Sequence, residues 1–222
     1  MTEGPRGWHG PLLLAADLRA ERPAGTADDI HFTEALAEAL ISRLTDPGDT
    51  VLDPFAGYGT TVAVATRLGR RAIGVELLPA HVSIARARAG SGATVIEGDA
   101  RHLLSLVDER VDLVLTSPPY MAAADHPENP MTGYATTDGD YGTYLGEVAD
   151  VCAQGVSLLR PGGRLVMNVA NVVDADGRVT PLVWDMAAAV GERVLLLGAT
   201  ELRWDEPPAG LAGDFLLWFG PG

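Results

Sequence analysis

The chain has 222 residues, of which 47% are hydrophobic and 21% charged, and this is the composition of a single folded globular domain. Its one cysteine, Cys152, excludes a disulfide framework and a thiolate metal cluster; no apolar run approaches the roughly 18 residues of a membrane span, so we expect a cytoplasmic protein. The net charge is −14 and every basic residue is arginine, which counts against nucleic-acid binding by bulk charge, because that affinity comes from clustered basic residues.

The predicted elements alternate between strands and helices after an irregular start. Residues 1–30 show no sustained period, so we expect a lead-in segment there and a single domain over residues 31–222. Helices are predicted over residues 33–44, 60–68, 79–89, 101–107, 141–159 and 181–190, and strands over residues 50–53, 72–75, 93–96, 111–115, 164–169, 193–197 and 215–219. This order predicts an α/β fold with one doubly wound, mostly parallel sheet and helices on both faces. Ligands of such folds bind at the carboxyl ends of the strands.

A glycine-rich loop, residues 53–61, joins the first of these strands to the next helix. Gly57 and Gly59 permit a tight turn, and the start of the helix supplies unpaired N–H groups, so the loop suits close contact with a ligand. A dinucleotide site is the alternative that such a loop raises. The loop lacks the third glycine of that motif, and the Asp53 carboxylate would repel a pyrophosphate but bond a cationic amino-acid group.

Two further acids follow at the ends of the next two strands. Glu76 ends the second strand, where an acid can bond both ribose hydroxyls, and Asp99 ends the third, where it can accept from an adenine amino group. A lone acid at a strand end is usually a solvated residue or a helix cap. Three acids in register with the glycine-rich loop instead indicate a site for an adenosine ligand.

The segment Thr116-Ser117-Pro118-Pro119-Tyr120 ends the fourth strand. Two consecutive prolines cannot continue a ladder, and Pro118 pushes Ser117 into an extended conformation. The simplest interpretation is a stiff strand-exit turn without further purpose. Its place after the three acids favours a functional turn that presents a hydroxyl, main-chain carbonyls and an aromatic ring. We call residues 117–120 the SPPY turn.

Together, the loop 53–61, Glu76, Asp99 and the SPPY turn resemble the amino-methyltransferases that use S-adenosylmethionine. This family includes DNA cytosine-N4 and adenine-N6 enzymes and some RNA-modifying relatives. The resemblance implies the Rossmann-like class I methyltransferase fold, the cofactor S-adenosylmethionine, and methyl transfer to an exocyclic amine of a nucleobase, with DNA as the partner by family.

The resemblance also implies which residues carry each role. The glycine-rich loop would hold the methionine part of the cofactor, Glu76 the ribose and Asp99 the adenine, while the segment 31–33 resembles the family's extra cofactor-contacting motif. The implied cofactor-binding residues are His31, Phe32, Thr33, Asp53, Phe55, Gly57, Gly59, Thr60, Glu76 and Asp99. The implied catalytic residues are Ser117, Pro118, Pro119 and Tyr120.

The SPPY turn suits the chemistry of a poorly nucleophilic amine. The lone pair of an exocyclic amine is drawn into its ring, and acceptors aimed at the two amine hydrogens return it to nitrogen as positive charge develops. Ser117 Oγ and the Pro118 carbonyl are the predicted acceptors, held rigid by the prolines. Tyr120 would stack on the base, which must be flipped out of a duplex. In the family, serine at the first position leans slightly towards cytosine-N4.

Residues 121–140 are predicted to form the substrate loop or lid. They contain four acids and no arginine, and acidic loops repel phosphate; we interpret His126 as a solvated loop histidine and expect no metal site. Tyr134 is the loop's aromatic residue. Two alternatives to DNA methylation therefore stay open: a methyltransferase of the same fold that acts on RNA, a small metabolite or a peptide amine, and a cofactor-binding subunit without activity of its own.

Overall fold

A computed structural model describes residues 8, 10–24, 26, 32–121, 129–133, 135–136 and 139–222. Within these ranges the strands are β1 (Leu12–Leu13), β2 (Thr50–Asp53), β3 (Arg71–Glu76), β4 (Ala93–Glu97), β5 (Val111–Thr116), β6 (Leu159–Val173), β7 (Val179–Thr180), β8 (Leu195–Trp204) and β9 (Leu211–Gly220). The α-helices are α1 (Ala15–Glu21), α2 (Glu34–Leu44), α3 (Thr60–Arg67), α4 (Pro79–Ala89), α5 (Leu103–Leu106), α6 (Tyr141–Leu158) and α7 (Leu182–Gly191). Short 3₁₀ turns span Gly90–Gly92, Ala100–His102 and Pro130–Thr132.

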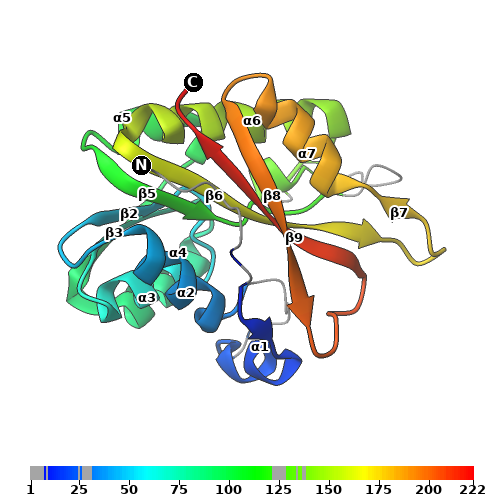
Figure 1. The fold of residues 1–222 in the computed structure, drawn as a ribbon, viewed down its shortest axis with the longest axis horizontal. Coiled ribbons are helices and arrows are strands. Elements are labelled where there is room, and N and C mark those ends of the chain that lie inside the picture. Colours follow the sequence, from blue (N-terminus) through cyan, green and yellow to red (C-terminus); the bar gives the residue numbers. More distant parts are fainter. Residues whose placement is uncertain are drawn as a thin grey trace.

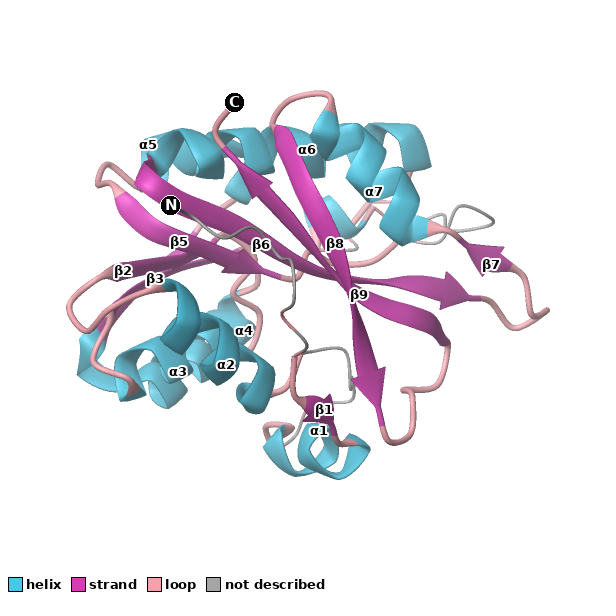
Figure 2. Ribbon diagram, in the orientation of Figure 1, coloured by secondary structure: helices cyan, strands magenta, loops and turns pink. Residues whose placement is uncertain are grey.

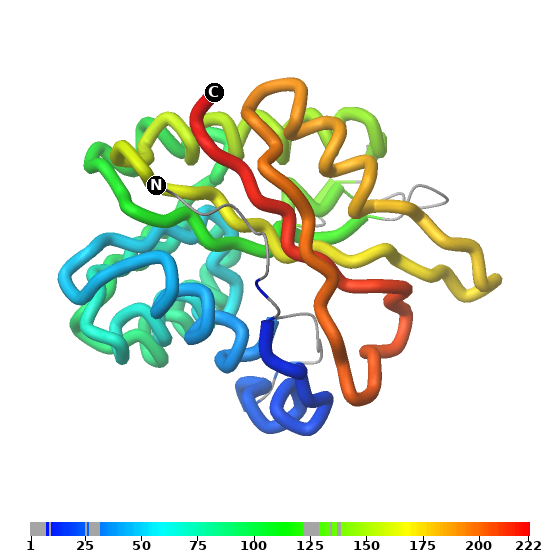
Figure 3. The backbone as a smooth tube through the Cα atoms, in the orientation of Figure 1, coloured from blue at the N-terminus to red at the C-terminus, as the bar shows by residue number. Residues whose placement is uncertain are grey.

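The described strands form one mostly parallel sheet in the order β1-β8-β9-β6-β5-β2-β3-β4, with β7 paired to β6 (Figure 1). From β4 to β6 all neighbours are parallel, whereas β9 runs antiparallel between β6 and β8 (Figure 3). Helices α2, α3 and α4 cover one face and α5, α6 and α7 the other (Figure 2). This is the doubly wound α/β fold that the element order predicts, and its parallel centre places four strand ends at one edge.

Two hydrophobic clusters, one on each face, hold the layers together. The apolar face of α6 contributes Tyr144, Val148 and Cys152 to the first cluster, and α2 contributes Leu36 and Leu40 to the second. Cys152 is fully buried, and burial raises the pKa of its thiol to about 12, so the thiol stays protonated. Cys152 is therefore a residue of the core.

Local signals predicted most boundaries well. Thr33 caps α2, because its Oγ1 accepts from the Leu36 N–H at 3.3 Å. Pro79 occupies the first turn of α4, as predicted for residues 79–89. The segment Pro161 to Gly163, which we expected to precede β6, instead lies inside it: Val111 pairs with Leu159 and Leu113 with Arg164, so the strand is irregular there. The late strand predicted over residues 193–197 is likewise longer and begins at Leu195.

Two short elements that the sequence pattern does not indicate lie within residues 1–30, where we expect the lead-in segment. Strand β1 pairs in parallel with the end of β8, and α1 follows at once. Both are too short for a hydrophobic period to show. The N-terminal N–H of α1 at Ala15 is satisfied by Asp205 Oδ1 at 2.8 Å, so its partner lies 190 residues away in the sequence. No helix in the described ranges is both long enough and apolar enough to cross a membrane.

Candidate active site

A cavity of about 210 Å³ lies at the carboxyl ends of β2, β3, β4 and β5. Five stretches of the described chain contribute most of its lining: residues 53–58, 75–78, 98–100, 117–120 and 130–133. The three predicted acids and the SPPY turn therefore line one cavity, although 64 residues separate Asp53 from Ser117 in the sequence. Parallel strands bring these stretches together, because their carboxyl ends share one edge of the sheet.

Asp53 connects the glycine-rich loop to the strand that carries the SPPY turn. Its side chain is buried, and Oδ1 accepts from Thr116 Oγ1 at 2.7 Å and from the Phe55 N–H at 3.0 Å. Burial raises the pKa of this carboxyl to about 6, against the opposing hydrogen bonds from Thr116 and Thr61. Thr116 directly precedes Ser117, so the loop and the turn are fixed relative to each other.

The two glycines of the loop have different tasks. Gly57 has φ +50° and lines the cavity, where its N–H donates to Glu76 Oε2 at 2.8 Å. Gly59 has φ +85° and directly precedes α3 as its N-cap. A Cβ atom there would lie 2.7 Å from the Cα of Ala85. Gly59 therefore lets the loop pack against α4, and it lies outside the described lining of the cavity.

Glu76 is held by main-chain groups at the centre of the cavity wall. Its Oε1 accepts from the Leu78 N–H at 2.8 Å, while Oε2 takes the Gly57 bond. His81 Nδ1 lies 3.7 Å from Glu76 Oε1, and the His81 ring meets the Tyr58 ring edge-on at 4.6 Å between centroids. Both aromatic residues line the cavity and were missed from the sequence; Tyr58 stands within the loop motif, which was the available signal.

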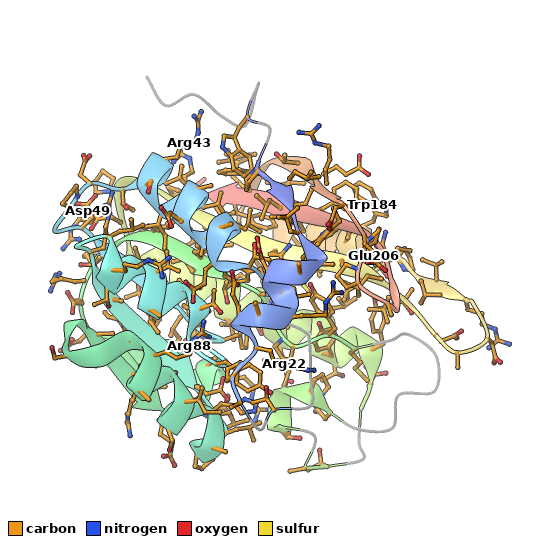
Figure 4. The ribbon with its side chains drawn as sticks, turned by 90° about the horizontal axis from the view of Figure 1, so that it is seen from below. Arg22, Arg43, Asp49, Arg88, Trp184 and Glu206 are labelled. Carbon is orange, nitrogen blue, oxygen red and sulfur yellow. The ribbon has the colours of Figure 1, made fainter. Side chains whose placement is uncertain are left out.

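An arginine braces this loop from outside. Arg88 of α4, labelled in Figure 4, donates from Nη1 to the Tyr58 carbonyl at 3.0 Å and from Nη2 to Glu34 Oε1 at 2.8 Å. Glu34 is the first residue of α2, so Arg88 ties the loop to the helix that follows the segment 31–33. Of that segment, Phe32 lines the cavity, Thr33 is buried as the helix cap, and His31 lies outside the described residues.

Asp99 stands at the end of the cavity formed after β4. Its side chain caps the turn Ala100–His102 through the Arg101 N–H at 2.9 Å. Burial acts to raise the pKa of this carboxyl, but hydrogen bonds from the Arg101 side chain and N–H outweigh it, and the pKa lies below its ordinary value. Asp99 is therefore an ionised acceptor at neutral pH.

The SPPY turn is fixed by α6. The Pro119 carbonyl accepts from the Tyr144 hydroxyl of that helix at 2.7 Å. Tyr120 lines the cavity, and burial raises the pKa of its hydroxyl well above its ordinary value. The Ser117 side chain and the Ala170 backbone act in the opposite direction on that pKa.

A buried carboxylate lies behind the turn. Asp214 of β9 is the cross-strand partner of Ala170, and it accepts from Asn168 Nδ2 at 2.6 Å and from Trp204 Nε1 at 2.9 Å. Burial raises its pKa to about 6, against the hydrogen bonds from Trp204 and Asn168. Its charge also acts on the Tyr120 hydroxyl. Sequence reasoning missed this cluster, whose members come from three late strands.

Comparison with known proteins shows partial similarity to DNA methylases. A model described as DNA methylase matches residues 19–87. Type II methyltransferase M2.DpnII of Streptococcus pneumoniae is 51% identical over 55 residues, which are 25% of this chain and 20% of that protein. The N-terminal part of the chain is therefore similar to DNA methylases, as the resemblance of its motifs predicts.

A second relative is named for a different substrate. The 4-amino-L-phenylalanine/4-methylamino-L-phenylalanine methyltransferase of Streptomyces pristinaespiralis is 34% identical over 145 residues, covering 60% of this chain and 47% of that protein. The chain thus matches less than half the length of each of these curated relatives.

Solved structures show the fold of the chain. A TehB-like methyltransferase from Corynebacterium glutamicum superposes with a TM-score of 0.51 at 20% identity, over 84% of this chain and 87% of the other. Magnesium protoporphyrin IX methyltransferase from Synechocystis gives a TM-score of 0.57 at 13% identity, over 85% and 81%. The predicted class I methyltransferase fold is confirmed.

Part of the predicted substrate loop, residues 121–140, contributes to the cavity wall. Pro130, Met131 and Gly133 line the cavity, although none of them was singled out from the sequence. Tyr134, His126 and the predicted acids at positions 125, 128 and 138 lie outside the described residues. Within the described ranges no group of three or more His, Cys, Asp or Glu side chains is arranged to hold a metal ion.

Proposed function

We propose that the chain moves a methyl group from S-adenosylmethionine to an aromatic amine, with the exocyclic amine of a DNA cytosine or adenine as the first candidate acceptor. One observation carries this proposal: the three acids and the SPPY turn line the same cavity. The family relationship supports it. A cytoplasmic location belongs to the same proposal, because the one cysteine is a buried, protonated thiol without a disulfide partner.

The residues of the cavity fit this cofactor. Asp99 supplies an ionised acceptor for the adenine amino group, Glu76 an acid for the ribose hydroxyls, and Asp53 a buried carboxylate for the methionine ammonium. A cation beside Asp53 would return its carboxyl to the ionised form, because opposite charge lowers the pKa that burial has raised. When bound, the cofactor supplies an electrophilic methyl group on a sulfonium.

The SPPY turn would activate the acceptor. The amine nitrogen forms a bond to the methyl carbon as the carbon–sulfur bond breaks, and positive charge develops on nitrogen. Ser117 Oγ and the Pro118 carbonyl accept from the two amine hydrogens and favour a tetrahedral nitrogen. The Tyr144–Pro119 and Asp53–Thr116 hydrogen bonds keep the turn in place. The proton leaves the product ammonium after transfer.

A small-molecule aromatic amine is the second candidate acceptor. The described lining of the cavity contains Asp53, Glu76 and Asp99 but no arginine, and the chain has a net charge of −14. Such a surface repels phosphate. The relative whose name gives an aminophenylalanine as substrate supports this candidate, since the lone pair of an aniline is also drawn into its ring.

Labelled methyl transfer separates the candidates. The chain is incubated with methyl-labelled S-adenosylmethionine and, in parallel, duplex DNA, RNA, a metabolite extract and 4-amino-L-phenylalanine. We expect label in DNA for the first candidate, and label only in small molecules would replace it with the second. Cofactor binding without transfer to any acceptor would identify a cofactor-binding subunit instead, and absence of cofactor binding would overturn the proposal. The Ser117→Ala variant is the control for label that does not depend on the turn.

A further inference from the structure

Arg101 joins two acids beside the cavity. Its Nε donates to Asp99 Oδ1 and Oδ2 at 3.1 and 3.0 Å, and its Nη2 donates to Oδ2 at 2.7 Å. On its other side, Nη1 donates to Glu147 Oε1 at 2.9 Å. Asp99 lines the cavity, whereas Arg101 and Glu147 lie outside its described lining. The guanidinium thus stands behind Asp99, which of its two acid partners is the one that lines the cavity.

Helix α6 fixes this arrangement to the SPPY turn. Glu147 and Tyr144 are three residues apart on α6, so they lie on the same side of the helix. Tyr144 holds the Pro119 carbonyl, and Gln154 of the same helix donates to the Arg101 carbonyl at 3.0 Å. One rigid helix therefore holds both the acid expected to contact adenine and the turn expected to contact the acceptor.

We propose that Arg101 is a positioning residue for adenine recognition, which fixes the Asp99 carboxylate so that it accepts a hydrogen bond from the 6-amino group of the cofactor. This inference rests on the function proposed above. A guanidinium fork engages both oxygens along one side of a carboxylate and leaves lone pairs on the other side for a ligand. Lysine cannot replace that fork, because its ammonium is a point charge.

Glu147 keeps the guanidinium from turning towards the cavity. Its Oε2 is buried and has no hydrogen-bond partner within the described residues, so its charge is compensated mainly through Arg101. Asp99 is the acid of this pair that lines the cavity, and its ion pair with Arg101 favours the ionised carboxylate. An ionised carboxylate selects an amino group over a carbonyl at the same position, since it only accepts hydrogen bonds.

Calorimetric binding of two ligands tests this inference. S-adenosylhomocysteine carries a 6-amino group, and S-inosylhomocysteine carries a carbonyl there; the measured quantity is the ratio of their dissociation constants. We expect the wild-type chain to prefer the adenosyl ligand, and Arg101→Gln to reduce that preference about tenfold, as befits one charge-assisted hydrogen bond. Arg101→Lys keeps the charge and serves as a second variant in case Arg101→Gln does not fold. Its preference for the adenosyl ligand should fall between those of wild type and Arg101→Gln.

Arg160→Gln is the matched control, because Arg160 donates to Asp112 Oδ2 at 2.7 Å far from the cavity lining and should leave the ratio unchanged. A wild-type ratio in both Arg101 variants would overturn the positioning role while leaving the proposed function intact. An equal loss in the Arg160 variant would do the same, since the effect would then reflect general stability. Failure of the wild-type chain to bind S-adenosylhomocysteine would instead overturn the proposed function, and this inference with it.

Discussion

Ser117 and Tyr120 both line the cavity, so the turn presents a hydroxyl group and an aromatic residue to the same space. The Pro119 carbonyl between them is held by the Tyr144 hydroxyl. A stiff strand-exit turn alone would need neither of these features.

Removing either group should abolish turnover without affecting the cofactor. We expect Ser117→Ala and Tyr120→Ala to bind S-adenosylhomocysteine within a few-fold of wild type while methyl transfer collapses. The reason is that the cofactor is expected to be held by Asp53, Glu76 and Asp99 and not by these two side chains. Tyr120→Phe retains the ring and loses the hydroxyl, so its turnover should fall between the wild type and Tyr120→Ala. Calorimetry and labelled transfer measure the two effects, and comparable losses in cofactor affinity would contradict this division of labour.

At the scale of elements, α6 positions the SPPY turn through a single hydroxyl. We expect Tyr144→Phe to lower the free energy of unfolding by about 1 kcal/mol, the net value of one hydrogen bond, and to lower kcat because the Pro119 carbonyl is no longer held. Tyr141→Phe is the matched control, since its hydroxyl bonds to Asp185 Oδ2 at 2.8 Å on α7. Chemical denaturation and steady-state kinetics separate the two variants; equal kcat losses would show that α6 acts on the turn by stability alone.

The two glycines of the loop between β2 and α3 should respond differently to alanine substitution. Gly57→Ala places a Cβ with no atom closer than 4.0 Å, so only the left-handed backbone is penalised, by about 1–2 kcal/mol. Gly59→Ala adds a collision with Ala85 of α4 and should lose more than that in the free energy of unfolding. Urea denaturation measures both, and equal losses would contradict the assigned packing role of Gly59.

For the whole molecule, two kinds of feature could be predicted from the sequence: helix starts, which have local signals, and site residues that parallel strands bring to one edge of the sheet. Thr33 and Pro79 marked helix starts, and Asp53, Glu76 and Asp99 share an edge because each ends or follows a parallel strand. The supporting contacts were not predictable, because their partners lie far apart in the sequence. The Tyr144–Pro119, Arg101–Glu147 and Asn168–Asp214 pairs are separated by 25, 46 and 46 residues.

The buried acids give the whole molecule an unusual dependence of stability on pH. The pKa of Asp214 rises from 3.8 to about 6 on folding. The folded state therefore holds its proton more tightly, so the contribution of Asp214 to stability is present below about pH 4 and lost as the pH rises through about 6. We expect the unfolding free energy of wild type minus that of Asp214→Asn to fall by on the order of 3 kcal/mol between about pH 4 and pH 7.

Asp205→Asn is the control for that measurement. The Ala15 N–H bond keeps the pKa of Asp205 below its ordinary value, so its contribution to stability is present at neutral pH and lost as the pH falls towards that lowered pKa. The wild-type-minus-variant difference should then rise with pH, opposite to the trend for Asp214. Urea unfolding at several pH values measures both differences, and the same sign for both would contradict the burial of Asp214 as the cause.

The hydrogen bond between Tyr144 and Pro119 also joins the two ends of the segment 120–143. With that base closed, lengthening the segment adds only about 0.6 kcal/mol of closure entropy for each doubling of its length. The described turn Pro130–Thr132 lies within this segment, and Pro130 and Met131 line the cavity, so an exchanged segment would change this wall while Asp53, Glu76 and Asp99 stay at the strand ends. The same framework is suited to the exchange of one acceptor-facing segment for another, so new acceptors are accessible by grafting rather than by rebuilding the core.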